Sequence, residues 1–192
     1  MVTSGEVLTN PVTREKIIFH KTARDTAGEL LRADLYLPPG GFVAAEHIHP
    51  LQEERFEVIS GTLQGRVAGK EISSAPGETV IVPKGIPHVW WNSGNEELHV
   101  QVEVRPALRL ENFFETFFGL AQDGKVNQKT GLPNLFQMAL IMRAFRHELV
   151  LAQPPQPVQT VLFGLLAPVG RLLGYQPEHP YPRSRPTQTQ IV

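Results

Sequence analysis

Cysteine is absent from this 192-residue sequence. Its absence excludes disulfide bonds, zinc–thiolate sites, iron–sulfur clusters and a cysteine nucleophile. An excess of charge is also missing, because 18 Lys and Arg residues face 19 Asp and Glu residues and the formal net charge is -1. A protein that binds nucleic acid normally carries a basic patch or stripe, so we expect no nucleic-acid partner.

Long apolar runs are missing as well. The longest apolar region spans residues 158–173, and glycines, a proline, Gln159 and Arg171 interrupt it. It is also shorter than the roughly 20 apolar residues that cross a bilayer, so we expect no membrane partner. The first residues lack the charged start, apolar stretch and cleavage site of a secretory signal, and we expect a cytoplasmic protein.

The sequence does contain many turn-forming residues, with 17 prolines and 16 glycines. Up to about residue 105, short apolar runs alternate with such breakers, and this pattern is typical of an all-β sandwich or barrel. The segment 98–104 alternates cleanly between apolar and polar residues, which predicts one buried face. The predicted strands are 16–19, 30–37, 42–49, 56–60, 63–67, 79–82, 88–92 and 98–104.

After Pro106 the spacing of the apolar residues changes from the period of a strand to that of a helix. Three apolar stripes at helical spacing begin at Leu110, Leu135 and Val158, and Asn134 is a plausible N-cap for the second. We therefore expect a β-barrel domain with a metal site over 1–106, a helical extension over 107–175 and an extended or disordered tail over 176–192. The apolar stripes exceed what one small barrel needs to cover, so we expect a homodimer.

The residues with the clearest chemistry are three histidines and a glutamate. His47 and His49 are two apart on a predicted strand, so both imidazoles point to the same face. Glu54 follows after a turn, and His88 begins another strand. Three imidazoles and one carboxylate that meet inside a barrel suit a divalent transition metal. Glu53 and Glu57 compete for the carboxylate role, but on a strand Glu57 has the parity of the outward face.

Two stretches of the sequence resemble the two signature motifs of the cupin superfamily. All ten specified positions match. In the first motif they are Gly41, His47, His49, Glu54 and Gly61, and in the second they are Gly77, Pro83, Gly85, His88 and Asn92. The resemblance covers about residues 15–105, and the remainder is similar to the helical extension of small bacterial single-domain cupins.

The resemblance implies a double-stranded β-helix (jelly-roll) barrel in which His47, His49, Glu54 and His88 bind one divalent metal ion per chain. Iron, manganese, nickel, cobalt, copper and zinc all remain open. Four protein ligands would leave about two of six octahedral positions free. The first hypothesis is a metal-dependent dioxygenase that resembles quercetinase-like cupins, acts on a small organic substrate and uses Glu54 as a base. The alternatives are a metal-dependent isomerase of a sugar or keto acid, and a metal-containing binding module without turnover.

Several aromatic and polar residues accompany these motifs. Trp90 has the parity of His88 and could line the pocket, whereas His99 is expected on the outer face. The stripe of Phe113, Phe114, Phe117 and Phe118 is interpreted as a docking surface rather than as a lid. Asn92 is expected to be a structural hydrogen-bonder.

Overall fold

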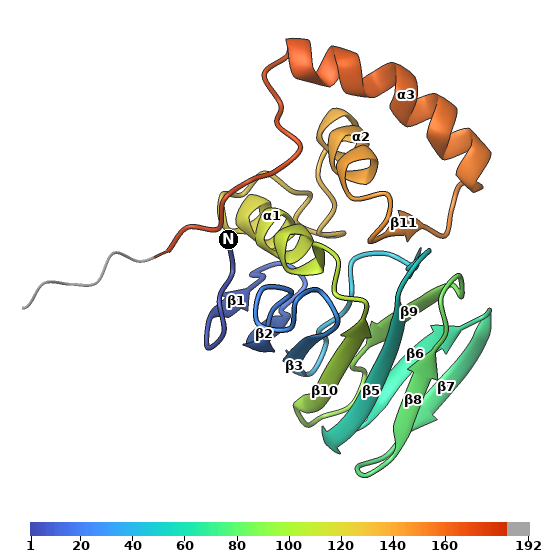
Figure 1. The fold of residues 1–192 in the computed structure, drawn as a ribbon. Coiled ribbons are helices and arrows are strands. Elements are labelled where there is room, and N and C mark those ends of the chain that lie inside the picture. Colours follow the sequence, from blue (N-terminus) through green and yellow to red (C-terminus); the bar gives the residue numbers. More distant parts are fainter. Residues whose placement is uncertain (184–192) are drawn as a thin grey trace, which may run out of the picture.

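The computed structural model describes residues 1–183, whose strands form two antiparallel sheets (Figure 1). The six-stranded sheet has the order β1-β2-β3-β10-β5-β8, and the five-stranded sheet has the order β11-β4-β9-β6-β7. The first sheet comprises β1 (Val7–Thr9), β2 (Lys16–Lys21), β3 (Leu31–Leu37), β10 (Leu98–Arg105), β5 (Glu53–Ser60) and β8 (Thr79–Val82). The second comprises β11 (Val150–Leu151), β4 (His47–Ile48), β9 (His88–Trp91), β6 (Leu63–Val67) and β7 (Lys70–Ser74).

Alternation along the central strands builds the core between the two sheets. On β10 the even-numbered residues from Leu98 to Val104 are buried, and the odd-numbered residues between them are partly exposed. β3 repeats the pattern, with its buried residues starting at Leu31 and ending at Leu37. Period-two burial is the direct consequence of side chains pointing to opposite faces of a strand. The buried face predicted for 98–104 is therefore confirmed.

The strands do not close into the barrel that the sequence predicts. Within residues 1–183 the hydrogen bonds join the strands into two separate sheets, not into one closed barrel. The strand predicted over 42–49 is also mostly wrong, because only His47–Ile48 forms a strand and Phe42 makes an isolated bridge to Trp91. Between them the chain follows β9 irregularly, with the Val43 amide donating to the Trp90 carbonyl.

Three helices cover one end of the two sheets (Figure 1). They are α1 (Leu110–Gln122), α2 (Leu135–Ala144) and α3 (Gln156–Leu172). The Asn134 side chain caps α2 by accepting hydrogen bonds from the amides of Phe136 and Gln137, as predicted. α3 contacts α2 and lies farthest from the sheets (Figure 1). No helix within residues 1–183 has the length and apolarity that a membrane crossing requires.

The chain between α2 and α3 returns to the sheet. β11 lies within the range expected to be helical, and it pairs with β4 through Val150 opposite Ile48 and Leu151 opposite His47. The Ala152 amide extends this contact by donating to the Glu46 carbonyl. The C-terminal part thus supplies a strand directly beside one of the histidines singled out in the sequence.

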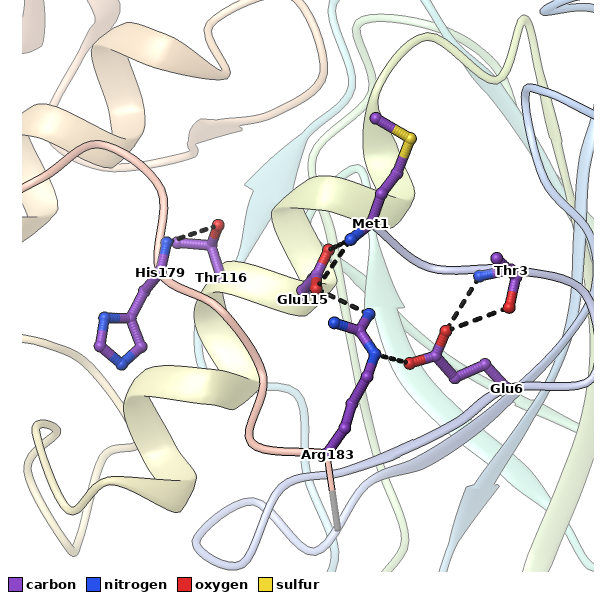
Figure 2. Close-up of polar contacts among 7 residues, drawn as sticks. All are labelled: Met1, Thr3, Glu6, Glu115, Thr116, His179 and Arg183. Atoms are coloured by element: carbon purple, nitrogen blue, oxygen red, sulfur yellow. Dashed lines mark hydrogen bonds and ion pairs between the residues drawn. The ribbon is translucent and has the colours of Figure 1, made fainter. Parts of the chain in front are cut away.

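The segment after α3 runs back along α1 toward the N-terminal residues (Figure 2). The Arg183 guanidinium bridges the carboxylates of Glu6 and Glu115, and Glu115 also pairs with the N-terminal ammonium group at 3.1 Å. The His179 amide donates to the Thr116 hydroxyl on the same helix. These contacts hold residues 176–183 in place, and the rest of the tail (184–192) lies outside the described residues.

One apolar row stays exposed, and it lies on α3. Its members are Val158, Val161, Leu165, Val169 and Leu172, and Leu172 is 89% exposed. The apolar stripes of α1 and α2, by contrast, are largely buried within the same chain. Association into a homodimer stays a prediction, and α3 is the helix that still offers an uncovered apolar face for it.

A test of the packing between β6 and β9 uses Gly65, which lies opposite Trp90. A Cβ atom at Gly65 would lie 2.5 Å from the Val89 carbonyl oxygen and closer still to the Trp90 indole. We expect Gly65→Ala to lower the free energy of unfolding by about 1–3 kcal/mol, measured by urea denaturation, because overpacking displaces buried groups.

The matched control is Gly164→Ala in α3, where the nearest atom to an added Cβ is the end of the Arg143 side chain at 3.4 Å. Alanine favours a helix over glycine by up to about 1 kcal/mol, so this variant should be neutral or slightly more stable. Equal stability of the two variants would contradict the close packing at Trp90.

Candidate metal centre

Three histidines and one glutamate meet at the inner surface between the two sheets. His47 lies on β4, and His49 directly follows the end of that strand. His88 lies on β9 and Glu54 lies on β5. Each offers one ligand atom, these atoms all lie within 4.8 Å of one another, and all four residues are buried. His47 and His88 are direct cross-strand partners, which explains why residues 41 positions apart come together. The four residues chosen from the sequence are thus brought to one place.

The polar atoms in this cluster face one another without forming ordinary hydrogen bonds. His88 Nε2 lies 2.7 Å from Glu54 Oε2, and His49 Nε2 lies 3.4 Å from Glu54 Oε1. Despite the short distance, neither His88 Nε2 nor Glu54 Oε2 has a partner in hydrogen-bond geometry among the described residues. Unsatisfied buried polar atoms are costly. Atoms aimed at a common point in this way fit a shared metal ion.

The other ring nitrogen of each histidine is held by an oxygen atom. His47 Nδ1 contacts the Ala45 carbonyl at 2.9 Å, and His88 Nδ1 contacts the Ile86 carbonyl at 3.1 Å. Since a carbonyl oxygen can only accept, Nδ1 must carry the proton in both rings. The lone pair of Nε2 is then free, which is the tautomer that a metal-binding imidazole needs.

Gln52 does the same for His49, although the sequence motifs do not predict it. Its side-chain oxygen lies 2.9 Å from His49 Nδ1, and its amide group donates to the carbonyls of Pro106 and Ala107. Because both carbonyls need a donor, they fix which end of the Gln52 amide faces His49. Gln52 is fully buried. The only signal in the sequence is a glutamine three positions after His49, and such a residue does not by itself indicate a contact with the histidine.

The electrostatics of the cluster reflect burial and mutual proximity. Burial by itself raises the pKa of Glu54, but the neighbouring His49 and His88 outweigh it and hold the pKa at about 2. Burial lowers the pKa of His47 well below its ordinary value, and the proximity of the other two rings adds to this effect. Burial also lowers the pKa of His88, but the Glu54 carboxylate outweighs it, so that this pKa is raised.

The competing residues lie elsewhere. Glu53 is exposed and Glu57 has the outward parity on β5, so Glu54 is the carboxylate of the cluster. His99 is on the outer face of β10, where its ring stacks on Tyr36 with centroids 4.3 Å apart. Asn92 is buried and donates to the carbonyls of Leu37 and Glu96, which confirms the expected structural role.

A largely apolar cavity of about 100 Å³ opens beside the cluster and extends between the two sheets. Trp90 lines it, as its parity predicted, together with Phe56. All four phenylalanines of α1 line it as well. The sequence alone predicts only a docking surface for this stripe. Docking is indeed what it does, but the same rings also form the cavity wall, because α1 lies across the open end of the sheets.

The cavity contains one carboxyl group outside the cluster. Glu15 precedes β2, lines the cavity and is only 6% exposed. Its Oε2 accepts a hydrogen bond of 2.6 Å from the Thr13 hydroxyl. Burial raises the pKa of Glu15 to about 7, and the Thr13 bond opposes this only in part. Nothing in the sequence distinguishes Glu15 from exposed glutamates, so its burial was not predictable.

Comparison with known proteins gives the family. Residues 34–104 match the family described as Cupin domain, and this range holds all four residues of the cluster. This part of the chain belongs to the cupin superfamily. A relative from the fungus Arthrobotrys oligospora, named as an oxidoreductase, is 28% identical over 161 residues, which is 75% of this cupin. The match spans 61% of the length of that relative.

Solved structures resemble this cupin more loosely. A predicted oxalate decarboxylase from Thermotoga maritima is 21% identical with a TM-score of 0.48, covering 55% of this chain and 99% of that one. A sugar phosphate isomerase of the cupin superfamily from Silicibacter pomeroyi is 18% identical with a TM-score of 0.45, covering 53% and 71%. Neither is close enough to transfer a function.

The role of Gln52 can be tested through metal affinity. Without the Gln52 oxygen, the His49 ring loses the partner that fixes its tautomer and orientation. We expect Gln52→Leu to weaken binding of cobalt(II) or zinc(II) by about 10–100-fold, measured by competition with a chelator, because loss of such supporting partners has effects of this size.

Gln159 provides the control, because it is also buried and also donates to two backbone carbonyls, those of Leu151 and Pro154. Gln159→Leu should lower stability while leaving metal affinity within about twofold of the wild type. If both variants lost metal equally, Gln52 would have only a structural role.

Glu15 should leave a signature in the pH dependence of stability. The pKa of Glu15 is raised from 4.5 to about 7 on folding. Its contribution to the free energy of unfolding is therefore fully present below pH 4.5 and is lost as the pH rises through 7. The loss amounts to at most about 3 kcal/mol. We expect Glu15→Gln to be more stable than the wild type at pH 8 and similar to it at pH 4.5.

The measurement is urea unfolding of metal-free protein across this pH range. All other titratable groups are the same in both proteins, so the difference between the two curves isolates Glu15. Parallel curves would mean that Glu15 ionises without a burial cost.

Proposed function

We propose that this cupin is a metal-dependent oxidoreductase, a dioxygenase in its simplest form, that acts on a small and mostly apolar organic substrate. The observation that carries the proposal is the convergence of three Nε2 lone pairs and the Glu54 carboxylate at the wall of an apolar, aromatic-lined cavity. The relative named as an oxidoreductase supports the reaction class. We propose one divalent transition metal per chain, and the donor set suits iron, manganese, nickel, cobalt, copper or zinc.

Each residue of the cluster has a separate task. His47, His49 and His88 hold the ion through Nε2, and their Nδ1 partners keep the rings in position. When bound, the ion supplies open coordination positions for oxygen donors and, if it is redox-active, electron transfer. Glu54 is ionised at neutral pH because of its low pKa, so it can hold the ion as a charged ligand. It is also the residue of the cluster that we propose as the acceptor of a proton from an acidic substrate hydroxyl.

The apolar wall determines what can reach the cluster. Phe56, Trp90 and Phe113 line the cavity between the two sheets and α1. Such walls exclude water and strengthen the interaction between charged groups inside. They also provide favourable contacts for an aromatic or aliphatic substrate.

The isomerase alternative fits this cavity less well. No Lys or Arg is found among the described residues that line it, and outside the cluster its charged side chains are limited to Glu15. A sugar or a phosphorylated sugar needs many hydrogen bonds or a cationic partner. A binding module without turnover has the same site requirements as the oxidoreductase, and catalysis is the property that separates the two.

Oxygen consumption provides the test. Metal-loaded protein should consume dioxygen with at least one substrate from a panel of flavonols, catechols and β-diketones. Glu54→Gln should reduce kcat by about 100-fold or more, because it removes a proton acceptor and a charged ligand together. The exposed neighbour supplies the control, and Glu53→Gln should leave the rate unchanged. Absence of oxygen consumption across the panel, with metal bound, would favour the binding module.

A further inference from the structure

Glu15 is a carboxyl group inside the cavity that has no cationic partner among the described residues. Its contacts consist of the Thr13 hydroxyl on Oε2, and no hydrogen bond reaches Oε1 within residues 1–183. Unlike a structural buried carboxylate, which is usually paired or multiply hydrogen-bonded, it keeps one oxygen available.

The turn before β2 holds this carboxyl group firmly. The Asn10 side chain accepts hydrogen bonds from the amides of Val12 and Thr13, and the Asn10 amide donates to the carbonyl of Glu15. The neighbouring charged residues point elsewhere: Arg14 donates to the Pro39 carbonyl, and the Lys16 ammonium lies over the Tyr36 ring. Glu15 therefore faces the cavity from a fixed backbone position.

The sheet order separates Glu15 from the metal centre. Glu15 adjoins β2 and Glu54 lies on β5, and β3 and β10 run between these strands. Three strand spacings correspond to about 14 Å across the sheet, and the strand register offsets the two groups along the strands as well. The wall between the two groups is apolar and includes Leu35 and Val102. A cavity with one polar group at each end and an apolar middle selects an elongated ligand that is polar at both ends.

We propose that Glu15 is a specificity-determining residue that hydrogen-bonds a hydroxyl group of the ligand at the end of the cavity opposite the metal centre. This inference rests on the proposed function, because the other end of the ligand must supply an oxygen donor to the metal. A hydroxyl fits better than a cation, because burial keeps Glu15 protonated up to about neutral pH, and a protonated carboxyl group both donates and accepts.

The test uses alkyl hydroxamic acids of six, eight and ten carbon atoms, with and without a hydroxyl group at the far end. The hydroxamate provides oxygen donors for the metal, and the terminal hydroxyl probes Glu15. Binding to cobalt(II)-loaded protein is measured by isothermal titration calorimetry. At one chain length we expect the hydroxylated compound to bind the wild type about five- to tenfold more tightly than its plain counterpart, as one good hydrogen bond allows.

The variants separate specificity from structure. In Glu15→Leu the preference for the hydroxylated compound should disappear, while the plain compound keeps its affinity within about twofold. Glu15→Gln should retain the preference, because an amide also accepts and donates. The control is Glu148→Gln, which alters a buried carboxyl group that pairs with Arg109 outside the cavity, and it should behave as the wild type does.

Two results would overturn this inference and leave the proposed function intact. One is equal affinity of the wild type for both compounds at every chain length. The other is an equal loss of affinity for both compounds in Glu15→Leu, which would indicate a structural role. Failure of cobalt(II) or of every hydroxamate to bind the wild type would overturn the proposed function, and the inference with it.

Discussion

The position of one proton on each cluster histidine is the constraint on which the site depends. The oxygen atoms of Ala45, Gln52 and Ile86 each require hydrogen on Nδ1, and they thereby leave Nε2 of each ring with a free lone pair. Two of these oxygens belong to the backbone, so the β4 and β9 regions enforce the tautomer through the fold itself. The third belongs to Gln52, whose orientation depends in turn on the chain just before α1. The ligand set and the helical part are consequently coupled.

The helical part completes the site rather than merely following it. α1 places its phenylalanines against the cavity, and β11 pairs with the strand that carries His47. The two sheets leave one end open, and an open end would admit water to the cluster. Covering that end with aromatic rings makes the surroundings of Glu54 and the histidines apolar, and this burial lowers the pKa of His47.

The sequence was most informative where residue spacing has a fixed geometric meaning. The motif positions predicted a cluster of His47, His49, Glu54 and His88, and strand parity separated Glu54 from Glu57. It was least informative where burial depends on distant segments. Gln52 and Glu15 are ordinary polar residues in the sequence, and only the neighbouring chain makes them interior. Likewise, β11 is two residues long, and such a short strand forms because β4 offers it a free edge.

The order of the elements along the chain has a consequence for how an ion reaches the cluster during synthesis. All four side chains of the cluster precede residue 89, whereas α1, α2 and β11 follow residue 109. At about 5–20 residues per second, a ribosome needs roughly 3–13 s to proceed from His88 to Leu151. For the first part of that interval the chain contains the histidines but not the phenylalanines of α1, and throughout it lacks the complete β11. A nascent chain can therefore be loaded with metal before its own C-terminal part closes the entrance.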